Sequence, residues 1–368
     1  MGNMDGQKIK IAQIVGNATT GGVISCVLNF YRHIDRNVFS FDFYSYGPSK
    51  YDEEIHALGG NVFYIPKAIR PLSHAAKLKK LLKDKDYDIV HAHLTTLSVV
   101  SLFAAKLAKV KVRVCHSHST THKAEATKIV KDVLRPFSRM FATHTAGCSE
   151  YSIRWLYGKK TAKTSFLLHN AIDLSKFEPN PELRQKQRKL LGIEDNFVFG
   201  TIGRFVYQKN YKFLIDAFAL FAKENQDAML LLVGDGEEKA DIVKRIQKHN
   251  LQDRVVILEE VNDVQKYYAT FDAFVLPSRY EGLPLVAVEA QAMNLPTLLS
   301  TEITHEADVG GIYCFADISS PRVWADEMQK VYDERPKYDV HDSLVGSNFD
   351  IENETHRLEN FYKEIVGR

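Results

Sequence analysis

Short apolar, strand-like runs alternate with helical segments along the whole chain, and this alternation constrains the fold more than any other feature. The first series of runs lies at 9–15, 41–46, 62–65, 88–93, 112–118, 144–149 and 165–170. The second series lies at 197–203, 228–234, 254–260, 272–278, 296–300 and 311–316. Apolar strands separated by helices are typical of parallel sheets that helices cover on both faces. The sequence therefore predicts an α/β protein.

A polar segment at 176–196 divides the two series and carries two prolines, so we expect a linker that leads into a helix. A chain of 368 residues is also longer than a single typical core. We therefore predict two Rossmann-like, doubly wound domains, at 1–175 and 176–350, that face a cleft. Ligands in such sheets bind beyond the carboxyl ends of the strands, so functional residues are expected in the loops at those ends.

The composition is that of an ordinary soluble globular chain, with 45% hydrophobic and 26% charged residues. No apolar run approaches the roughly 20 residues that a membrane-spanning helix needs, and the N-terminus shows no apolar signal segment. Cys26, Cys115, Cys148 and Cys314 are dispersed without CxxC spacing, which is typical of a reducing compartment. We therefore expect a cytoplasmic protein.

Charge is unevenly distributed along the chain, although the net charge is only +2. Residues 1–175 hold 25 Lys and Arg against 13 Asp and Glu, whereas residues 176–368 hold 23 against 33. A basic half indicates an anionic partner. The basic residues show no interleaved aromatic pattern and no DNA-reading motif, which argues against nucleic acid and favours a membrane surface or a phosphorylated lipid. The lysine-rich segment 73–85 is either a solvated helix on its sheet or a peripheral membrane contact.

Two cations follow the first strand of the second series. Arg204 and Lys209 stand five positions apart in "RFVYQKN", in the loop that leaves this strand. A guanidinium fork and an ammonium group at such a place can clamp a diphosphate. Two solvated surface charges would give the same sequence pattern, so the pair alone leaves both interpretations open.

Two carboxylates bracket a turn in "SRYEGLPLVAVEAQAMNLPT" (278–297). Glu281 precedes a Gly-Leu-Pro turn, and Glu289 falls in the second turn of the expected helix, whose first residue we expect to be Pro284. Carboxylates are costly to bury without a partner, so we expect Glu281 and Glu289 to hold opposite ends of a nucleotide-sugar, with Glu289 at the ribose. The alternative is an exposed turn residue and an exposed helix residue. Free N–H groups at the start of this helix would form an anion site, and they belong to Gly282, Leu283 and Leu285.

The first strand is followed by "GNATTGGV", in which Gly21 and Gly22 open a helix. This loop lacks the GxGxxG fingerprint of dinucleotide-binding proteins. The two glycines would let the backbone approach a ligand at a helix N-terminus. The steric demands of a strand–helix turn explain them equally well.

Together, "GRFVYQKN" and "PSRYEGLPLVAVEAQAMNLPT" resemble the retaining GT-B glycosyltransferases of the GT4 family, in which an Arg/Lys loop and a Glu-x7-Glu pair recur at this separation. The segments "TTGGV", "DIVHAH", "HSHST", "CSEYS", "HNAIDLSKF" and "LVGDGEE" match in the same order, so the resemblance covers essentially the whole chain. The segment "TEITHEADVGGIYCFA" is similar to bacterial exopolysaccharide and capsule transferases of that family. The resemblance implies a GT-B fold whose final helix, 351–368, crosses back to the first domain.

The resemblance also implies roles for individual residues. Arg204 and Lys209 would bind the donor diphosphate and stabilise the departing nucleotide, while Glu289 would hold the ribose hydroxyls. Glu281 would hold the donor sugar and phosphate together with backbone groups of Gly282, Leu283 and Leu285.

Three further residues receive roles by the same resemblance. A histidine at the end of an N-domain strand faces the donor sugar in this family, and His118 matches it best. Gly21 and Gly22 would approach the phosphate or the acceptor.

The implied activity is retaining transfer of a hexose or N-acetylhexosamine from a UDP-sugar donor to a glycan or polyprenyl-linked glycan acceptor in polysaccharide biosynthesis. Fixed cations and helix N–H groups can stabilise the leaving diphosphate, so we expect neither a metal nor a cofactor. A lipid-linked acceptor would place the enzyme at the inner face of the cell membrane. Two alternatives are a non-catalytic GT-B subunit that supports a partner transferase, and another GT-B activity such as a sugar phosphorylase or epimerase.

A group of aspartates and a group of histidines could each be interpreted as a metal site. Asp84, Asp86 and Asp88 contain an Asp-x-Asp pattern, but they precede a strand, whereas sites form at strand carboxyl ends. The histidines form two HxH pairs, each pointing to one face of its strand, without an accompanying carboxylate motif. We therefore expect the histidines to line the cleft as polar strand-end residues, and they are His91, His93, His116, His118 and His122.

Overall fold

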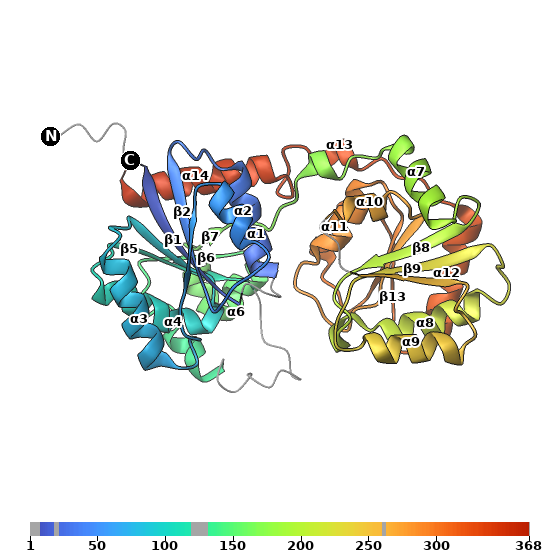
Figure 1. Cartoon of the computed structure of the whole chain (residues 1–368), viewed down its shortest axis with the longest axis horizontal. Helices are drawn as coiled ribbons and strands as arrows, with labels where there is room; N and C mark the ends of the chain where they lie inside the picture. Colours follow the sequence, from blue (N-terminus) through green and yellow to red (C-terminus); the bar gives the residue numbers. More distant parts are fainter. Residues whose placement is uncertain (1–7, 18–21, 119–131, 260–262, 368) are drawn as a thin grey trace. The chain divides into compact units, whose positions relative to one another are not determined.

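The computed structural model describes residues 8–17, 22–118, 132–259 and 263–367, which form two compact units (Figure 1). Unit 1 comprises Met1–Ala171 with Ile351–Arg368, and unit 2 comprises Ile172–Asp350. Each unit holds one parallel sheet with helices on both faces. The predicted α/β architecture with two Rossmann-like sheets is therefore confirmed.

The sheet of unit 1 has the order β3-β2-β1-β4-β5-β6-β7. Its strands are buried almost throughout, as β1 shows with seven of eight residues buried. Such burial on both faces explains why these strands read as continuous apolar runs. The strands are β1 (Ile9–Gly16), β2 (Phe39–Ser45), β3 (Asn61–Tyr64), β4 (Ile89–Ala92), β5 (Val112–Ser117), β6 (His144–Gly147) and β7 (Phe166–Leu167).

Helices cover both faces of this sheet (Figure 1). Helices α1 and α14 pack on the face that carries Ile9 and Ile11, whereas α3, α4 and α6 pack on the face that carries Ala12 and Ile14. The described helical segments of unit 1 are α1 (Gly22–His33), α2 (Asp52–Ala57), α3 (Pro71–Lys83), η1 (Thr95–Leu97), α4 (Ser98–Leu107), η2 (Arg135–Phe137), α6 (Glu150–Ala162) and α14 (Ile351–Val366).

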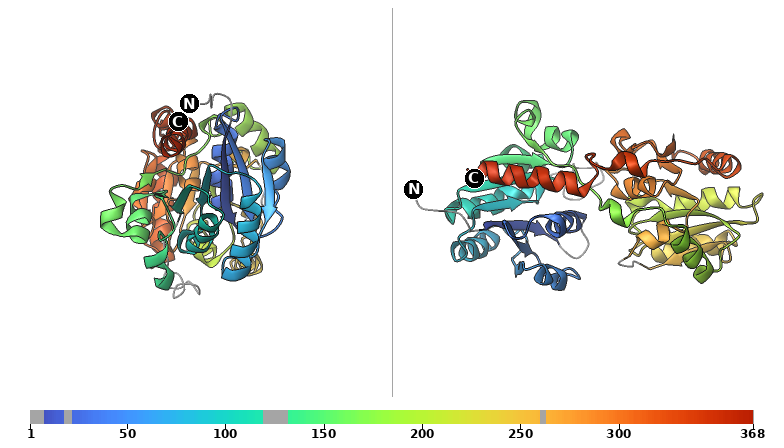
Figure 2. Two further views of the ribbon diagram at one scale, coloured as in Figure 1. Left: turned by 90° about the vertical axis from the view of Figure 1, so that its left-hand side faces the viewer. Right: turned by 90° about the horizontal axis from the view of Figure 1, so that it is seen from above.

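Helix α14 is separated from the rest of unit 1 in sequence but completes its core. Figure 2 shows this helix, in red, running along unit 1. The ring of Tyr362 lies 6.1 Å from the ring of Phe39 and 6.1 Å from the ring of Phe41. Tyr362 is fully buried, so α14 is part of the layer that covers the sheet.

The sheet of unit 2 has the order β10-β9-β8-β11-β12-β13, and every described strand pair in it is parallel. Its first strand and the strand beside it, β8 and β11, lie at the centre of this order. The strands are β8 (Phe197–Ile202), β9 (Ala228–Val233), β10 (Val255–Leu258), β11 (Ala273–Leu276), β12 (Thr297–Ser300) and β13 (Ile312–Ala316).

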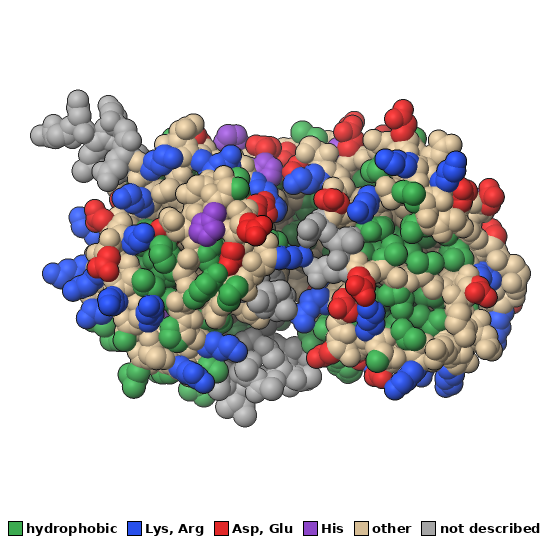
Figure 3. Space-filling model, in the orientation of Figure 1, with side chains coloured by type: hydrophobic (Ala, Val, Ile, Leu, Met, Phe, Trp, Pro, Cys, Tyr) green, Lys and Arg blue, Asp and Glu red, His purple; other side chains and the backbone are tan. Residues whose placement is uncertain are grey.

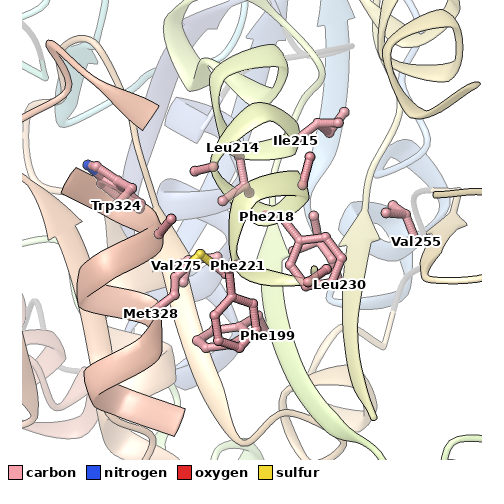
Figure 4. Close-up of a cluster of buried hydrophobic side chains, with 14 of the residues drawn as sticks. Phe199, Leu214, Ile215, Phe218, Phe221, Leu230, Val255, Val275, Trp324 and Met328 are labelled. Atoms are coloured by element: carbon pink, nitrogen blue, oxygen red, sulfur yellow. The ribbon is translucent and has the colours of Figure 1, made fainter. Parts of the chain in front are cut away.

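Aromatic packing dominates one face of this second sheet. Figure 4 shows Phe218 and Phe221 of α8 packed with Phe199 of β8 and with Trp324 and Met328 of α12. The other face is covered by α10, α11 and α13. The described helical segments of unit 2 are η3 (Leu174–Lys176), α7 (Pro181–Leu191), η4 (Tyr207–Lys209), α8 (Tyr211–Phe221), α9 (Lys239–Lys248), α10 (Gln265–Tyr268), α11 (Leu285–Ala292), η5 (His305–Ala307), α12 (Pro321–Glu334) and α13 (His341–Leu344).

Local capping explains where the helices near the predicted linker and turn begin. The side chain of Asn180 accepts the N–H of Leu183 at 2.9 Å and caps α7, and Gly192 ends this helix in a left-handed conformation. The expectation for Pro284 was wrong by one position. Pro284 has an extended backbone (ψ 100°) and is the N-cap of α11, so Leu285 is the first helical residue.

None of the helices within the described residues is both long enough and apolar enough to cross a membrane.

Candidate functional site

The loops after β8 and β11 meet at one edge of the second sheet. The two strands are adjacent and parallel, so their carboxyl ends lie at the same edge. The backbone N–H of Arg279, after β11, donates to the carbonyl of Gln208, after β8, at 2.8 Å. This contact holds together the two loops in which the sequence placed the cations and the carboxylates.

Lys209 and Glu281 form an ion pair between these loops. Lys209 Nζ lies 2.7 Å from Glu281 Oε1, and the two side chains are only 15% and 10% exposed. The carboxylate of Glu281 also accepts the hydroxyl of Ser278 at 2.9 Å and the amide N–H of Gln208 at 3.0 Å. Glu281 is therefore held in one position by three side chains, of which the sequence analysis had identified only Lys209.

Gly203 makes room for the lysine of this pair. A Cβ at Gly203 would lie 3.2 Å from Cε of Lys209, and the residue has a φ of +156°. Asn210, which follows Lys209, has a left-handed backbone with a φ of 59° and joins η4 to α8. The missing side chain at Gly203 thus leaves room for Lys209 beside Glu281, which the spacing of charges in the sequence does not reveal.

Glu289 lies in the second turn of α11, as predicted from its spacing. Its Oε2 accepts the hydroxyl of Tyr268 at 2.7 Å. Burial raises the pKa of Glu289 to about 7, while the hydroxyl of Tyr268 and the charge of Lys209 act in the opposite direction. Tyr268 was missed by the sequence analysis, because a tyrosine in a short helix 21 residues upstream carries no motif.

The start of α11 supplies backbone N–H groups at the same place. The first N–H groups of a helix have no acceptor within it, and no described residue accepts the N–H of Gly282, Leu283 or Leu285. Gly282 is exposed, and a Cβ there would meet nothing within 4 Å. Packing of the chain does not require this glycine, which leaves space for a ligand close to the backbone. Arg204 precedes η4 in the neighbouring loop and has an exposed side chain.

The predicted histidines of unit 1 form a cluster, but their expected exposure was largely wrong. His91, His93 and His116 are only 1%, 6% and 1% exposed, because α14 and its Tyr362 cover the face to which they point. His118, at the end of β5, is partly exposed. Two predicted residues, His122 and Gly21, lie outside the described residues, while Gly22 is exposed at the first position of α1.

The cluster is arranged as hydrogen-bonded ring pairs, which disfavours a metal site. Ring nitrogens of His91, His93 and His116 lie within 4.8 Å of one another. However, Nε2 of His91 faces Nδ1 of His116 at 3.0 Å, and Nδ1 of His93 faces Nε2 of His118 at 2.7 Å. These contacts use the in-plane directions that metal coordination would need. Asp88, from the Asp-x-Asp pattern, accepts the backbone N–H of Lys10 instead.

Two protein-family models match the chain, one in each half. A model described as "Glycosyltransferase Family 4" matches residues 20–176, and one described as "Glycosyl transferases group 1" matches residues 183–338.

Individual relatives extend this similarity over the full length. The glycosyltransferase EpsF of Bacillus subtilis is 33% identical and aligns over 98% of this chain and 97% of its own. An Escherichia coli enzyme named UDP-Gal:alpha-D-GlcNAc-diphosphoundecaprenol alpha-1,3-galactosyltransferase is 33% identical over 65% of each chain. The crystal structure of Anabaena HepE in complex with UDP and glucose has a TM-score of 0.82 at 19% identity and covers 96% of this chain and 99% of that chain. The chain therefore belongs to the GT4 family of retaining glycosyltransferases with the GT-B fold, and it is related to the bacterial glycosyltransferases of capsule and exopolysaccharide biosynthesis.

Proposed function

We propose that this chain transfers a hexose or N-acetylhexosamine from a UDP-sugar to a glycan or lipid-linked glycan during polysaccharide biosynthesis, with retention of configuration. The observation that carries the proposal is the meeting of Lys209, Glu281 and the start of α11 at the joined ends of β8 and β11. Glu289 lies one helical turn further along the same helix. This group combines a cation, free N–H donors and a carboxylate, which suit a diphosphate and a ribose.

The proposed donor is held from its sugar to its ribose by separate groups. Lys209 and Arg204 bind the diphosphate together with the backbone N–H groups of Gly282, Leu283 and Leu285. Glu281 contacts the sugar and Glu289 accepts hydrogen bonds from the ribose hydroxyls. A UDP donor is supported by the relatives, since HepE was solved with UDP and the Escherichia coli relative is named for UDP-Gal.

The chemistry follows from where charge develops. As the bond between C1 of the sugar and the diphosphate oxygen breaks, negative charge grows on the diphosphate. Fixed positive groups aimed at that oxygen favour this transition state, and Arg204, Lys209 and the α11 N–H groups supply them. The acceptor hydroxyl bonds to C1 on the face that the diphosphate leaves, and its proton passes to the departing diphosphate. This route needs neither a metal nor a carboxylate nucleophile.

The acceptor and the remaining contacts are assigned to unit 1. His118 contacts the donor sugar, and Gly21 and Gly22 allow the backbone of their loop to approach the phosphate or the acceptor. A polyprenyl-linked acceptor is supported by the Escherichia coli relative, whose name specifies a diphosphoundecaprenol substrate.

A lipid-linked acceptor fits a peripheral contact between unit 1 and the anionic inner face of the cell membrane. Helix α3 begins beside two strongly exposed apolar side chains, Ile69 at 64% and Leu72 at 87%, and continues with lysines. Figure 3 shows Lys and Arg side chains spread over the face of this unit that is turned to the viewer. Apolar insertion next to basic residues is the physical basis of interfacial binding. The cysteines, which form no disulfide in the structure, fit a cytoplasmic location.

Transfer to a defined acceptor tests the proposed function. The purified chain is incubated with UDP-glucose, UDP-galactose or UDP-N-acetylglucosamine and an undecaprenyl diphosphate-linked sugar, and the anomeric configuration of the product is read by NMR. We expect a retained, α-configured product that Lys209→Ala abolishes and that Lys248→Ala, a change on the exposed surface of α9, leaves intact. An inverted product, or no transfer from any UDP-sugar, would contradict the proposal.

A further inference from the structure

Three buried histidines of unit 1, His91, His93 and His116, belong to a single chain of hydrogen bonds that ends at the partly exposed His118. The contacts run from His118 Nε2 to His93 Nδ1 at 2.7 Å and from His93 Nε2 to Gln13 Oε1 at 2.8 Å. Gln13 Nε2 lies 3.1 Å from the hydroxyl of Tyr362. The chain continues from that hydroxyl to His91 Nδ1 at 2.7 Å, and from His91 Nε2 to His116 Nδ1 at 3.0 Å.

One member of the chain has a fixed direction. A neutral imidazole can carry its proton on either nitrogen, and a tyrosine hydroxyl can turn, so these groups donate or accept as their neighbours require. The side-chain amide of Gln13 has one end that only accepts and another that only donates. Gln13 is 1% exposed, and both ends of its amide are engaged. Its orientation therefore sets the direction of every other hydrogen bond in the chain.

The protons follow from that orientation. Because Gln13 Oε1 accepts, His93 must carry its proton on Nε2, and its Nδ1 must accept the Nε2–H of His118. His118 then presents an unprotonated Nδ1. A turned amide would donate to His93, move its proton to Nδ1, and convert the outer nitrogen of His118 from an acceptor into a donor.

The hydrogen bonds on the other side of Gln13, which lead to His116, have their directions set in the same way. Gln13 donates to the Tyr362 oxygen, so the hydroxyl donates to His91 Nδ1 and His91 donates from Nε2 to His116 Nδ1. The remaining proton of His116 lies on Nε2, which is buried without a hydrogen-bond partner in the structure. The outer nitrogen of His118 is consequently the one lone pair that this chain offers to a ligand. Burial lowers the pKa of His118 to about 4, which keeps the ring neutral at neutral pH.

We infer that Gln13 is a positioning residue that fixes His118 in the Nε2–H tautomer, so that its Nδ1 accepts a hydrogen bond from a hydroxyl of the bound sugar. This inference rests on the proposed function for the identity of the ligand only. It specifies that the ligand group at His118 is a hydrogen-bond donor, whereas a carbonyl or phosphate oxygen would face a lone pair and be repelled.

Histidine tautomers in the unliganded protein test the inference without any substrate. In protein labelled with ¹⁵N-histidine, two-bond ¹⁵N–¹H spectra show which ring nitrogen carries the proton. We expect all four rings in the Nε2–H form in the wild type. A His118 that carries its proton on Nδ1 would overturn the inference, even if the chain proved to bind no nucleotide-sugar.

Two substitutions at Gln13 separate positioning from simple packing. Gln13→Met keeps the size but removes both hydrogen bonds, so His118 should populate both tautomers. Transfer should then fall about tenfold, the equivalent of one hydrogen bond, while the affinity for UDP, which lacks the sugar, stays unchanged. Gln13→Glu, when ionised, places an oxygen that can only accept against His93 Nε2, so it should rescue both the His118 tautomer and transfer.

Ser101→Ala serves as a control substitution elsewhere in unit 1. Ser101→Ala removes a partner of another buried histidine, His74, and should change the His74 signals but leave those of His118 unchanged. An unaltered His118 tautomer in Gln13→Met would overturn the inference, as would a transfer defect shared equally by Gln13→Glu. Failure of the wild type to bind UDP would instead contradict the proposed function and leave the tautomer result standing.

Discussion

At the scale of single residues, the charge of Lys209 in the candidate donor site is balanced by a carboxylate of the protein itself. Glu281 neutralises Lys209 at 2.7 Å, and burial favours the neutral form of Glu289 below about pH 7. A diphosphate that binds Lys209 must therefore compete with Glu281, and a ribose that binds Glu289 must favour its ionised form. The protonation of Glu289 and the charge of Glu281 should consequently have separate, measurable effects.

Donor affinity should depend on pH through Glu289. An ionised carboxylate accepts from both ribose hydroxyls, and its neutral form does so poorly, so UDP-sugar affinity should rise about tenfold between pH 6 and pH 8. Calorimetry with a UDP-sugar is suitable because its diphosphate carries no terminal phosphate group that titrates near pH 6. Glu289→Gln should bind more weakly and show no such rise. Equal wild-type affinities at pH 6 and pH 8 would contradict the assignment.

Substitution of Glu281 should separate binding of the diphosphate from transfer of the sugar. Glu281→Gln frees the charge of Lys209, so the affinity for UDP should rise about fivefold, the value of a partly exposed ion pair. Loss of the carboxylate that holds the sugar should slow transfer about 100-fold. UDP titration and initial rates measure the two effects. A parallel loss of UDP affinity and rate would show that Glu281 supports the site only structurally.

At the scale of elements, strands were predictable and pairings between distant elements were not. The predicted run 197–203 is β8, and 228–234 is β9, each to within one residue, because central parallel strands are apolar along their whole length. Strand β2 begins at Phe39, two residues before its predicted start. The start of α11 was misplaced because a proline fits both the N-cap and the first helical position, and only the observed ψ angle of Pro284 distinguishes them.

Helix α14 should contribute to the unfolding free energy of unit 1, and substitution of Glu354 tests this prediction. Its carboxylate is fully buried, accepts the backbone N–H of His169 at 2.8 Å and pairs with Arg357. Glu354→Leu would leave the backbone N–H of His169 without its acceptor, while the half-exposed Arg357 keeps the carbonyl of Leu167, so the loss should be about 1–3 kcal/mol of unfolding free energy. Urea denaturation measures this loss. Glu364→Ala, on the exposed side of the same helix, should change it by less than about 0.5 kcal/mol.

At the scale of the whole molecule, the order of the motifs along the chain is enough to indicate the family. The geometry of the site, however, depends on contacts between residues that are far apart in the sequence. Lys209 and Glu281 pair over 72 residues, and Tyr362 reaches His91 over 271. Neither contact can be predicted from the spacing of residues within a single motif. The expected exposure of His91 and His93 was wrong for the same reason, since the helix that buries them lies at the other end of the chain. Residue types at strand ends were thus predictable, whereas their partners required the fold.

Calorimetric titration of UDP-, GDP- and ADP-sugars into the wild type, Lys209→Ala and Glu289→Ala tests the central claim most directly. We predict that one UDP-sugar binds the wild type, and that each variant loses about tenfold to hundredfold in affinity, because each removes a hydrogen bond that involves a charged group. Lys248→Ala should bind as the wild type does. Absence of binding by every UDP-sugar, or equal binding by all variants, would contradict a donor site at the joined ends of β8 and β11.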